Sequence, residues 1–520
     1  MGFFTRSRTT RKNPNTGNPS ELRLGRRWAY SIHDCENRTL QNTIRDKRKH
    51  LGTPSKQIDY RYMNNYDIVI NQAHVMDPES GLDQLTNVGI SQGKIAKISE
   101  SPMEGEQIID ASGYVLCPGF IDLHCHPQDT QIFEVQALDG VTTTLELEVG
   151  TNNVSHFYSR WENQSPINFG ASIGHIPVRM KVMNDPGVFL PSGDAGRKPA
   201  TNSEIIEMQN LIRQGLEEGA LAVGFGLDYT RAASRWEVIQ MFKIAAEYNA
   251  SCHVHLRGKG HLEPSNAIEA LEEVIAASAI TGAPLHVVHL NSTGMRAVPQ
   301  LLDMISGANQ SGLDVTTECY PYTAGMTKIE SALFDEGWQE HYGINYEQLM
   351  RPDTGEYLTA KTFSEYRESG GWVITFSTPE DSMTAAVKSP LTMIATDSII
   401  EDGKGHPRTA GSYTKVLGEH VREKGDLDLM SAISKMTIMP ARRLEKRAPA
   451  FLNKGRIKEG ADADIVIFDP MTVKDQSTYT DPTRPPIGLS HVIVNGIPVV
   501  SNSKLEQGAL PGKGILATTN

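Results

Sequence analysis

Residues 115–126 read VLCPGFIDLHCH, a short apolar run that ends in two histidines one residue apart, His124 and His126. In an extended strand, residues i and i+2 point to the same side, so both imidazoles leave the strand end together. Two neutral imidazoles that converge on one point suit a borderline metal ion such as Zn²⁺. Taken alone, the pattern also fits a pair of buried, hydrogen-bonded histidines, so the rest of the chain has to decide.

From residue 119 onward, apolar strands alternate with amphipathic helices. Residues 203–218 follow helical spacing from an N-cap serine, Ser203, and residues 235–248 and 266–280 read similarly. Eight strand–helix units are most economically arranged as an α/β fold of the (β/α)₈ TIM-barrel type, with reactive groups at the C-terminal ends of the strands. The expected strands are residues 119–126, 140–150, 167–175, 221–226, 250–257, 284–290, 314–320 and 391–397.

Short, half-polar strands precede and follow the barrel region in the sequence. We expect residues 65–115 and 447–512 to form one composite β-sandwich beside a catalytic barrel of residues 116–446. The connection 326–373 is too long for an ordinary loop, which predicts a lid or side domain over the barrel mouth, with an inert surface insertion as the alternative. The flanking strands are expected at residues 67–71, 87–91, 93–98, 107–111, 455–469 and 491–500.

Metal-ligand residue types stand at the ends of several expected strands. Glu146 and Glu148 share one face of the second strand, where buried carboxylates are costly unless they are paired or bound to a metal. The later residue lies nearer the C-terminal end and is the expected ligand. His255 is preferred over His253 for the same reason. A lone histidine of this kind is commonly a core residue, but the whole set predicts a centre for one or two Zn²⁺ ions. The expected ligands are His124, His126, Glu148, His255, His289 and Asp397.

Composition excludes several classes of partner. The net charge of −12 argues against nucleic acid, and the chain has no apolar run long enough for a membrane span. Residues 1–60 contain 13 Lys and Arg against five Asp and Glu. Residues 1–64 are therefore expected to form a basic, disordered extension, with an organelle transit peptide as the alternative. Five scattered cysteines indicate reduced thiols and a cytoplasmic location, and a homo-oligomer is compatible with these features.

Longer motifs resemble the amidohydrolase superfamily and, within it, the N-acyl-D-amino-acid deacylase (D-aminoacylase-like) group. The resemblance covers roughly residues 65–512 and is strong for the superfamily. The motifs are PGFIDLHCH (118–126), DGVTTT (139–144), GALAVGFGLDY (219–229), YPYTAG (320–325) and HPRTAG (406–411).

The resemblance implies roles for individual residues. It places the family's metal-binding histidines on the four expected histidine ligands and its catalytic aspartate on Asp397. The tyrosine and arginine that hold the substrate carboxylate fall on Tyr229 and Arg408. Such deacylases commonly use a cysteine near the end of strand two, where this chain has Glu148. A family lysine two residues after the strand-six histidine is replaced by Asn291, which removes one cation from the expected carboxylate pocket.

These features together predict a metal-dependent hydrolase of a non-peptide C–N bond that deacylates an N-acyl amino acid, expected to be of the D type. The metal activates a water, and Asp397 takes its proton and passes it to the leaving amine. Arg408, with Tyr229, binds the carboxylate of a small-molecule amide substrate, since a guanidinium fits it bidentately. The alternative for Arg408 is a surface ion pair. Asn291 and Arg179 are further candidates near the substrate.

Two other functions compete with this prediction. Cyclic amidases of the dihydroorotase or hydantoinase type use a carboxylated lysine on strand four, but residues 221–229 contain no lysine. A non-catalytic barrel that serves as a scaffold is the other alternative, and the intact set of expected ligands argues against it.

Overall fold

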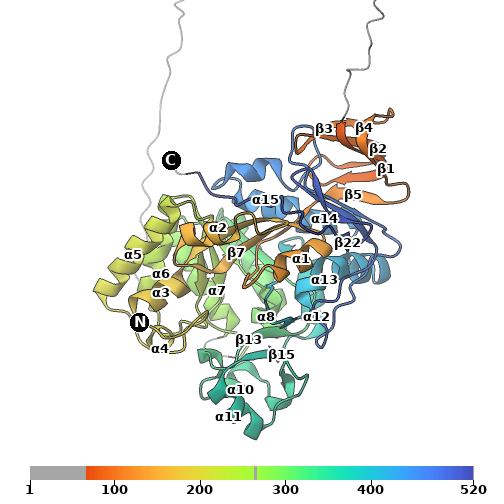
Figure 1. Cartoon of the computed structure of the whole chain (residues 1–520). Helices are drawn as coiled ribbons and strands as arrows, with labels where there is room; N and C mark the ends of the chain where they lie inside the picture. The colour runs from red at the N-terminus through yellow and green to blue at the C-terminus, as the bar shows by residue number, and fades with distance from the viewer. Residues whose placement is uncertain (1–65, 263–265, 519–520) are drawn as a thin grey trace, which may run out of the picture. The chain divides into compact units, whose positions relative to one another are not determined.

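The computed structural model describes residues 66–262 and 266–518, and an eight-stranded parallel barrel forms its centre (Figure 1). This confirms the predicted fold class. Ser398 closes the barrel, because its N–H donates to the His124 carbonyl at 3.2 Å and its carbonyl accepts from the His126 N–H at 2.8 Å. The strands are β6 (Phe120–Asp122), β7 (Val141–Thr151), β8 (Asn168–Gly174), β9 (Ala222–Gly226), β10 (Ser251–His255), β11 (Leu285–Val287), β12 (Val315–Cys319) and β16 (Thr392–Ile394).

Helices connect the barrel strands. The helix expected to start after Ser203 is instead capped by Thr201, which forms a reciprocal capping box with Glu204. Within the described ranges, no helix combines the length and apolar character needed to cross a bilayer. The helices of this region are α1 (Gln131–Leu138), α2 (Val154–Trp161), α3 (His175–Val182), α4 (Asp194–Arg197), α5 (Asn202–Glu217), α6 (Arg235–Glu247), α7 (Ala267–Thr281), α8 (Leu290–Gly294), α9 (Val298–Gln310), α12 (Glu380–Lys388), α13 (Arg408–Lys415), α14 (Leu429–Met436) and α15 (Ile438–Leu444).

A second, nine-stranded sheet combines the two flanking parts of the chain. Its order is β22-β21-β20-β19-β5-β1-β2-β3, with β4 also paired to β1, so the N- and C-terminal strands meet where β5 pairs with β19. Alternate side chains of these two strands pack into different cores, as period-two alternation requires. The strands are β1 (Tyr66–Asp77), β2 (Leu82–Ser91), β3 (Lys94–Ser99), β4 (Gly105–Asp110), β5 (Val115–Pro118), β19 (Ile465–Phe468), β20 (Leu489–Val494), β21 (Ile497–Ser501) and β22 (Lys504–Leu505).

Gly119 joins this sheet to the barrel, because β5 ends at Pro118 and β6 begins at Phe120. A Cβ atom at Gly119 would lie only 2.1 Å from Thr142 Oγ1 on β7. No side chain fits there, so glycine lets one continuous segment pass from the sheet into the barrel wall. The segment that carries the histidines after β6 is therefore anchored both in the nine-stranded sheet and in the barrel.

The insertion between the seventh and eighth barrel strands folds as a small subdomain. Its three-stranded sheet has the order β13-β15-β14. Trp338 stacks on Phe363 at 5.3 Å between ring centroids and meets Phe334 edge-on at 5.5 Å, which gives the subdomain an aromatic core. Its elements are β13 (Gly325–Lys328), α10 (Trp338–Tyr342), β14 (Leu349–Met350), α11 (Ala360–Ser369) and β15 (Trp372–Thr375), and the hairpin β17 (Ile400–Glu401) and β18 (Lys404–Gly405) follows β16.

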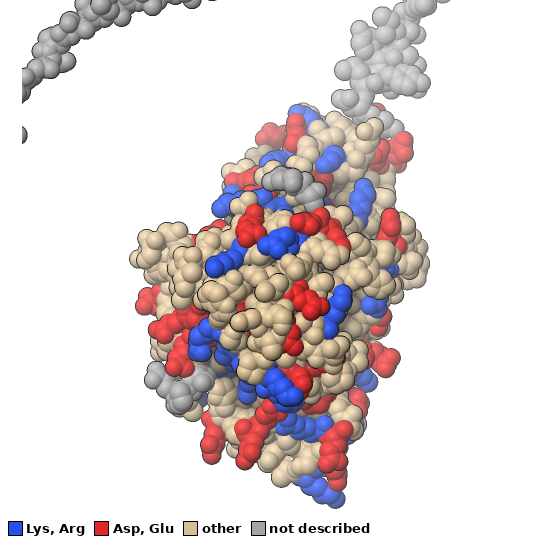
Figure 2. Space-filling model, turned by 90° about the vertical axis from the view of Figure 1, so that its left-hand side faces the viewer, with Lys and Arg blue, Asp and Glu red and all other residues tan. Residues whose placement is uncertain are grey.

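Charged side chains are mixed on the surface. On the face drawn in Figure 2, Lys and Arg side chains alternate with Asp and Glu side chains, so the acidic surplus does not gather into one patch there. The basic extension expected for residues 1–64 lies outside the described residues.

Candidate active site

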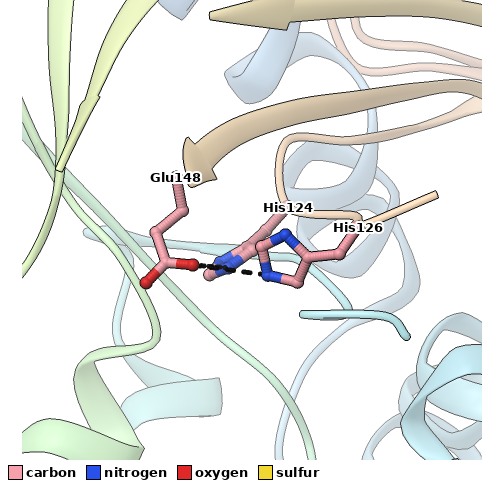
Figure 3. A group of neighbouring side chains, drawn as sticks. All are labelled: His124, His126 and Glu148. Atoms are coloured by element: carbon pink, nitrogen blue, oxygen red, sulfur yellow. Dashed lines mark hydrogen bonds and ion pairs between the residues drawn. The ribbon is translucent and has the colours of Figure 1, made fainter. Parts of the chain in front are cut away.

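Glu148, near the end of β7, lies to one side of the two histidines that follow β6 and points one carboxylate oxygen toward both (Figure 3). Its Oε2 atom is 3.2 Å from His124 Nε2 and 3.3 Å from His126 Nε2. Asp397 Oδ1, which follows β16, lies 3.5 Å and 3.4 Å from the same two nitrogens. Two imidazole nitrogens and two carboxylate oxygens from three barrel strands therefore face one small space.

The other oxygen of Glu148 belongs to a second set of donor atoms. Oε1 lies 2.9 Å from Nδ1 of His255, the last residue of β10, and 3.9 Å from Nε2 of His289, which follows β11. The two ring nitrogens are 3.1 Å apart. The Thr293 hydroxyl is 3.3 Å from His289 Nδ1 and helps to orient that ring. Glu148 thus presents one oxygen to each set.

The backbone is unusual at two of these positions. His289 has φ 32° and Asp397 has φ 51°, both in the left-handed region that non-glycine residues rarely adopt. Strained residues of this kind persist where the surrounding structure holds them, and they cluster at functional sites. At both strand ends the turn aims the side chain inward, His289 toward the Glu148 carboxylate and Asp397 toward His126.

Further carboxylates support the histidines from behind. Glu318 on β12 lies 2.6 Å from His124 Nδ1 through one oxygen and 3.0 Å from His286 Nε2 through the other. Glu146 lies 2.8 Å from His126 Nδ1. A carboxylate that accepts from Nδ1–H leaves Nε2 free to donate its lone pair to a cation. Glu318 and Glu146 therefore favour, in neutral His124 and His126, the tautomer that metal binding needs.

Electrostatics at the site favour a positive charge. Burial disfavours charge on His124, but Asp397 and Glu318 raise its pKa to about 10. Burial also opposes charge on Glu148, but contacts with three histidines hold its pKa well below its ordinary value. The Glu148 carboxylate thus stays ionised, and the buried carboxylates draw protons onto His124 and His126. A divalent cation would supply that charge and release the protons, so this donor set fits a metal such as Zn²⁺.

A narrow cavity lies above these groups. Arg408 reaches it from α13, with Nη1 2.9 Å from Asp397 Oδ2 and its guanidinium over the Tyr320 ring at 4.6 Å. Within the described part of the chain, none of the three guanidinium nitrogens makes a hydrogen bond. Tyr229 also lines the cavity, where its hydroxyl lies 3.1 Å from Thr327 Oγ1. The wall therefore combines a cation with hydrogen-bonding groups.

Comparison with known proteins agrees with this geometry. A model described as the amidohydrolase family matches residues 229–500. The chain belongs to the amidohydrolase family. It is 28% identical to an N-acyl-D-glutamate deacylase from Alcaligenes xylosoxydans xylosoxydans over 83% of this chain and 93% of the relative. A D-aminoacylase from the same organism is 25% identical over 84% of this chain and 94% of the relative.

A solved structure is similar as well. The N-acyl-D-glutamate deacylase from Bordetella bronchiseptica, in complex with zinc and a phosphonate inhibitor, superposes with a TM-score of 0.76 at 25% identity. The match covers 87% of this chain and all of that one. The predicted family and enzyme class are confirmed: the amidohydrolase hydrolyses a C–N bond other than a peptide bond.

Two predicted substrate contacts lie elsewhere in the amidohydrolase. Arg179, on α3, is fully buried, with its Nε donating to the Ala195 carbonyl at 2.7 Å and its guanidinium paired with Glu237. Asn291 donates to the backbone carbonyl of Tyr320 at 3.0 Å. Neither side chain lines the cavity, so the structure does not bring them to the expected substrate site. Arg179 joins helices α3 and α6, and Asn291 fixes the chain after β12.

The sequence prediction also omitted a buried acid of the amidohydrolase. Glu318 stands in the expected strand 314–320, two residues after Thr316 and two before Tyr320. This spacing places it on one face of the strand, and that signal could have identified it.

Proposed function

We propose that this chain removes the acyl group from N-acyl-D-amino acids with one or two Zn²⁺ ions. The observation that carries the proposal is the position of Glu148, whose two oxygens face two separate sets of histidines. The deacylases similar to this chain support the substrate class, and the zinc in the Bordetella relative supports the metal.

The metal ligands in this proposal come from five barrel strands. His124, His126 and Asp397 would hold one ion, His255 and His289 the other, and Glu148 would contribute to both. A carboxylate with two separated oxygens can bridge two ions, so it replaces the cysteine expected near this position. When bound, Zn²⁺ lowers the pKa of a coordinated water and polarises the substrate carbonyl.

Asp397 is placed to move the proton. Burial raises the pKa of its carboxyl, but Arg408 and His124 hold it well below the ordinary range, so the group is ionised. Its Oδ1 atom faces the His126 ring nitrogen, and its Oδ2 atom faces the Arg408 guanidinium. Asp397 can therefore accept a proton beside the attacked carbonyl and deliver it to the leaving amine.

Arg408 is placed to bind the α-carboxylate. Arg408 Nη1 pairs with Asp397, but the buried Nε and Nη2 make no hydrogen bond, which is costly, and a substrate carboxylate would accept from these two nitrogens. Because Arg408 adjoins Asp397, this carboxylate would sit on the amine side of the scissile bond. The pairing thus fits an acylated amino acid.

The insertion 326–373 would act as a lid. Met326, Thr327 and Trp372 line the cavity. Trp372 also lies 6.1 Å from Phe189, between ring centroids, and Phe189 packs on His126 at 5.3 Å. The two aromatic rings stand between the donor atoms and an outer groove, so their separation would admit substrate.

The test combines metal analysis with a substrate panel. We expect the purified protein to contain zinc and to release amino acids from N-acetyl-D- but not N-acetyl-L-amino acids. His289→Asn should lower the metal content, whereas His175→Asn, which changes a buried histidine paired with Glu237 outside the cavity, should not. Turnover of dihydroorotate or hydantoin alone would assign the chain to the cyclic amidases. If no substrate is hydrolysed and no metal is bound, a non-catalytic scaffold would be favoured.

A further inference from the structure

The cavity contains a second cation, Lys259, on the segment that follows β10. Its side chain is partly buried among cavity residues and lies 5.6 Å from the Tyr342 ring. Among the described residues, it has neither an ion pair nor a hydrogen bond. Burial lowers the pKa of Lys259, while the charge of Asp228 raises it. A cation held in this way lacks an anionic partner.

Neighbouring charges do not supply that partner. Asp228 is buried, but Arg231 already pairs with it at 2.7 Å and Tyr342 donates to it at 3.0 Å. Arg257, two residues before Lys259, pairs with Glu273 at 2.8 Å. The charges of Asp228 and Arg231 offset each other, as do those of Arg257 and Glu273, so neither of these acids is left to neutralise Lys259.

Lys259 and Arg408 stand in different sectors of the barrel rim. Lys259 follows β10, whereas Arg408 follows β16, and β11 and β12 lie between those strands in the barrel. Asn291, after β11, adds no charge between them and does not line the cavity. One substrate carboxylate bound by Arg408 would leave Lys259 unsatisfied. The two sectors are therefore suited to two anionic groups on one substrate.

We propose that Lys259 binds a second carboxylate of the substrate, so that the preferred substrates are N-acyl amino acids with two carboxylates. This inference rests on the proposed deacylase function. The second carboxylate can come from the amino-acid side chain or from the far end of the acyl chain, and both present the same chemistry to an ammonium group. Among the described residues that line the cavity, Lys259 and Arg408 are the only Lys or Arg side chains, so a carboxylate far from Arg408 has only Lys259 to pair with.

Two matched substrate pairs test the proposal in the zinc-loaded enzyme. N-acetyl-D-glutamate is compared with N-acetyl-D-glutamine, and N-succinyl-D-alanine with N-butanoyl-D-alanine. We expect one dicarboxylate to exceed its uncharged partner in kcat/KM. In Lys259→Met this ratio should fall on the order of 10- to 100-fold, mainly through KM, because a charge-assisted hydrogen bond is lost. The pair that responds identifies where the second carboxylate resides.

Two further variants separate charge from folding. Lys259→Arg keeps the positive charge and should retain much of the preference. Lys243→Met, on the exposed face of α6, should leave the ratio unchanged. Zinc content and thermal unfolding report whether each variant is folded.

The outcomes separate this inference from the proposed function. If the enzyme hydrolyses N-acyl-D-amino acids but shows ratios near one for both pairs, the deacylase function stands and the role of Lys259 is overturned. An equal loss for charged and uncharged substrates in Lys259→Met would also overturn it. If no N-acyl amino acid is hydrolysed, both proposals fail.

Discussion

Replacing Glu318 by glutamine should weaken metal binding without touching a proposed ligand. The Glu318 carboxylate accepts from His124 at 2.6 Å and from His286 at 3.0 Å. Glutamine has nearly the same shape but only one oxygen, so its amide NH₂ must face one of the two histidines. If it faces His124, two donors meet, and the ring is driven toward the tautomer that protonates Nε2. That nitrogen would then be blocked for the cation.

The expected size of the effect follows from the electrostatics of Glu318. Burial raises its pKa, but His124 and His286 lower it overall from 4.5 to about 2. A shift of this size corresponds to roughly 3 kcal/mol in favour of the ionised form, after the opposing cost of burial has been subtracted. Loss of a carboxylate behind a histidine ligand typically lowers metal affinity by about 10- to 100-fold, or roughly 1.4–2.7 kcal/mol. The expected loss of metal-binding energy is thus no larger than the stabilisation of the ionised Glu318.

The assay is a competition titration of the metal-free protein with a chromophoric zinc chelator. Glu237→Gln is a matched control, because Glu237 is also a fully buried acid 2.8 Å from a histidine, His175, but lies outside the cavity. We expect Glu237→Gln to lower stability and leave the zinc affinity within about twofold of the original. A Glu318→Gln protein that binds zinc as tightly as the unchanged chain would refute the reasoning.

Three other variants probe the site and the fold. Asp397→Asn should lower kcat by about 100-fold or more while elemental analysis finds the metal largely retained, since the proton carrier is lost. Glu148→Ala should reduce bound metal in the same analysis, and an unchanged stoichiometry would remove Glu148 from the centre. Lys454→Met should destabilise the protein by about 3–5 kcal/mol in chemical unfolding, because the buried Asp464 loses its partner at 2.7 Å. Burial raises the pKa of Asp462, but Lys454 and Lys94 lower it overall. The ionised Asp462 carboxylate therefore stabilises the fold fully above its ordinary pKa, and this stabilisation should fade as the pH drops below about 4.

The barrel could be predicted because its strands are buried on both faces. Such strands read as continuous apolar runs, and their polar exceptions mark the rim, as His255 and Glu148 do. The predicted ends of the barrel strands were less accurate. The sixth strand was expected over 284–290, but it stops at Val287, and His289 adopts a left-handed turn. A strand pattern cannot reveal that turn, because the turn depends on contacts from other segments.

Side chains on connecting segments were harder to place. Arg179 was expected near the substrate, but it lies on α3, where Glu237 from α6 neutralises it. Lys259 was not singled out, because whether a residue after β10 turns inward depends on how the whole segment packs. In both cases the deciding partner is distant in sequence, and no local pattern encodes it.

The pairing of β5 with β19 has a consequence during synthesis. Strand β5 emerges from the ribosome early, whereas its neighbour β19 emerges only after the entire barrel has been translated. Until then Val115 and Leu116 expose an unpaired, apolar strand edge of the kind that invites aggregation. Newly made chains should therefore depend on a chaperone during this interval, and a slowly translated mRNA should prolong that dependence.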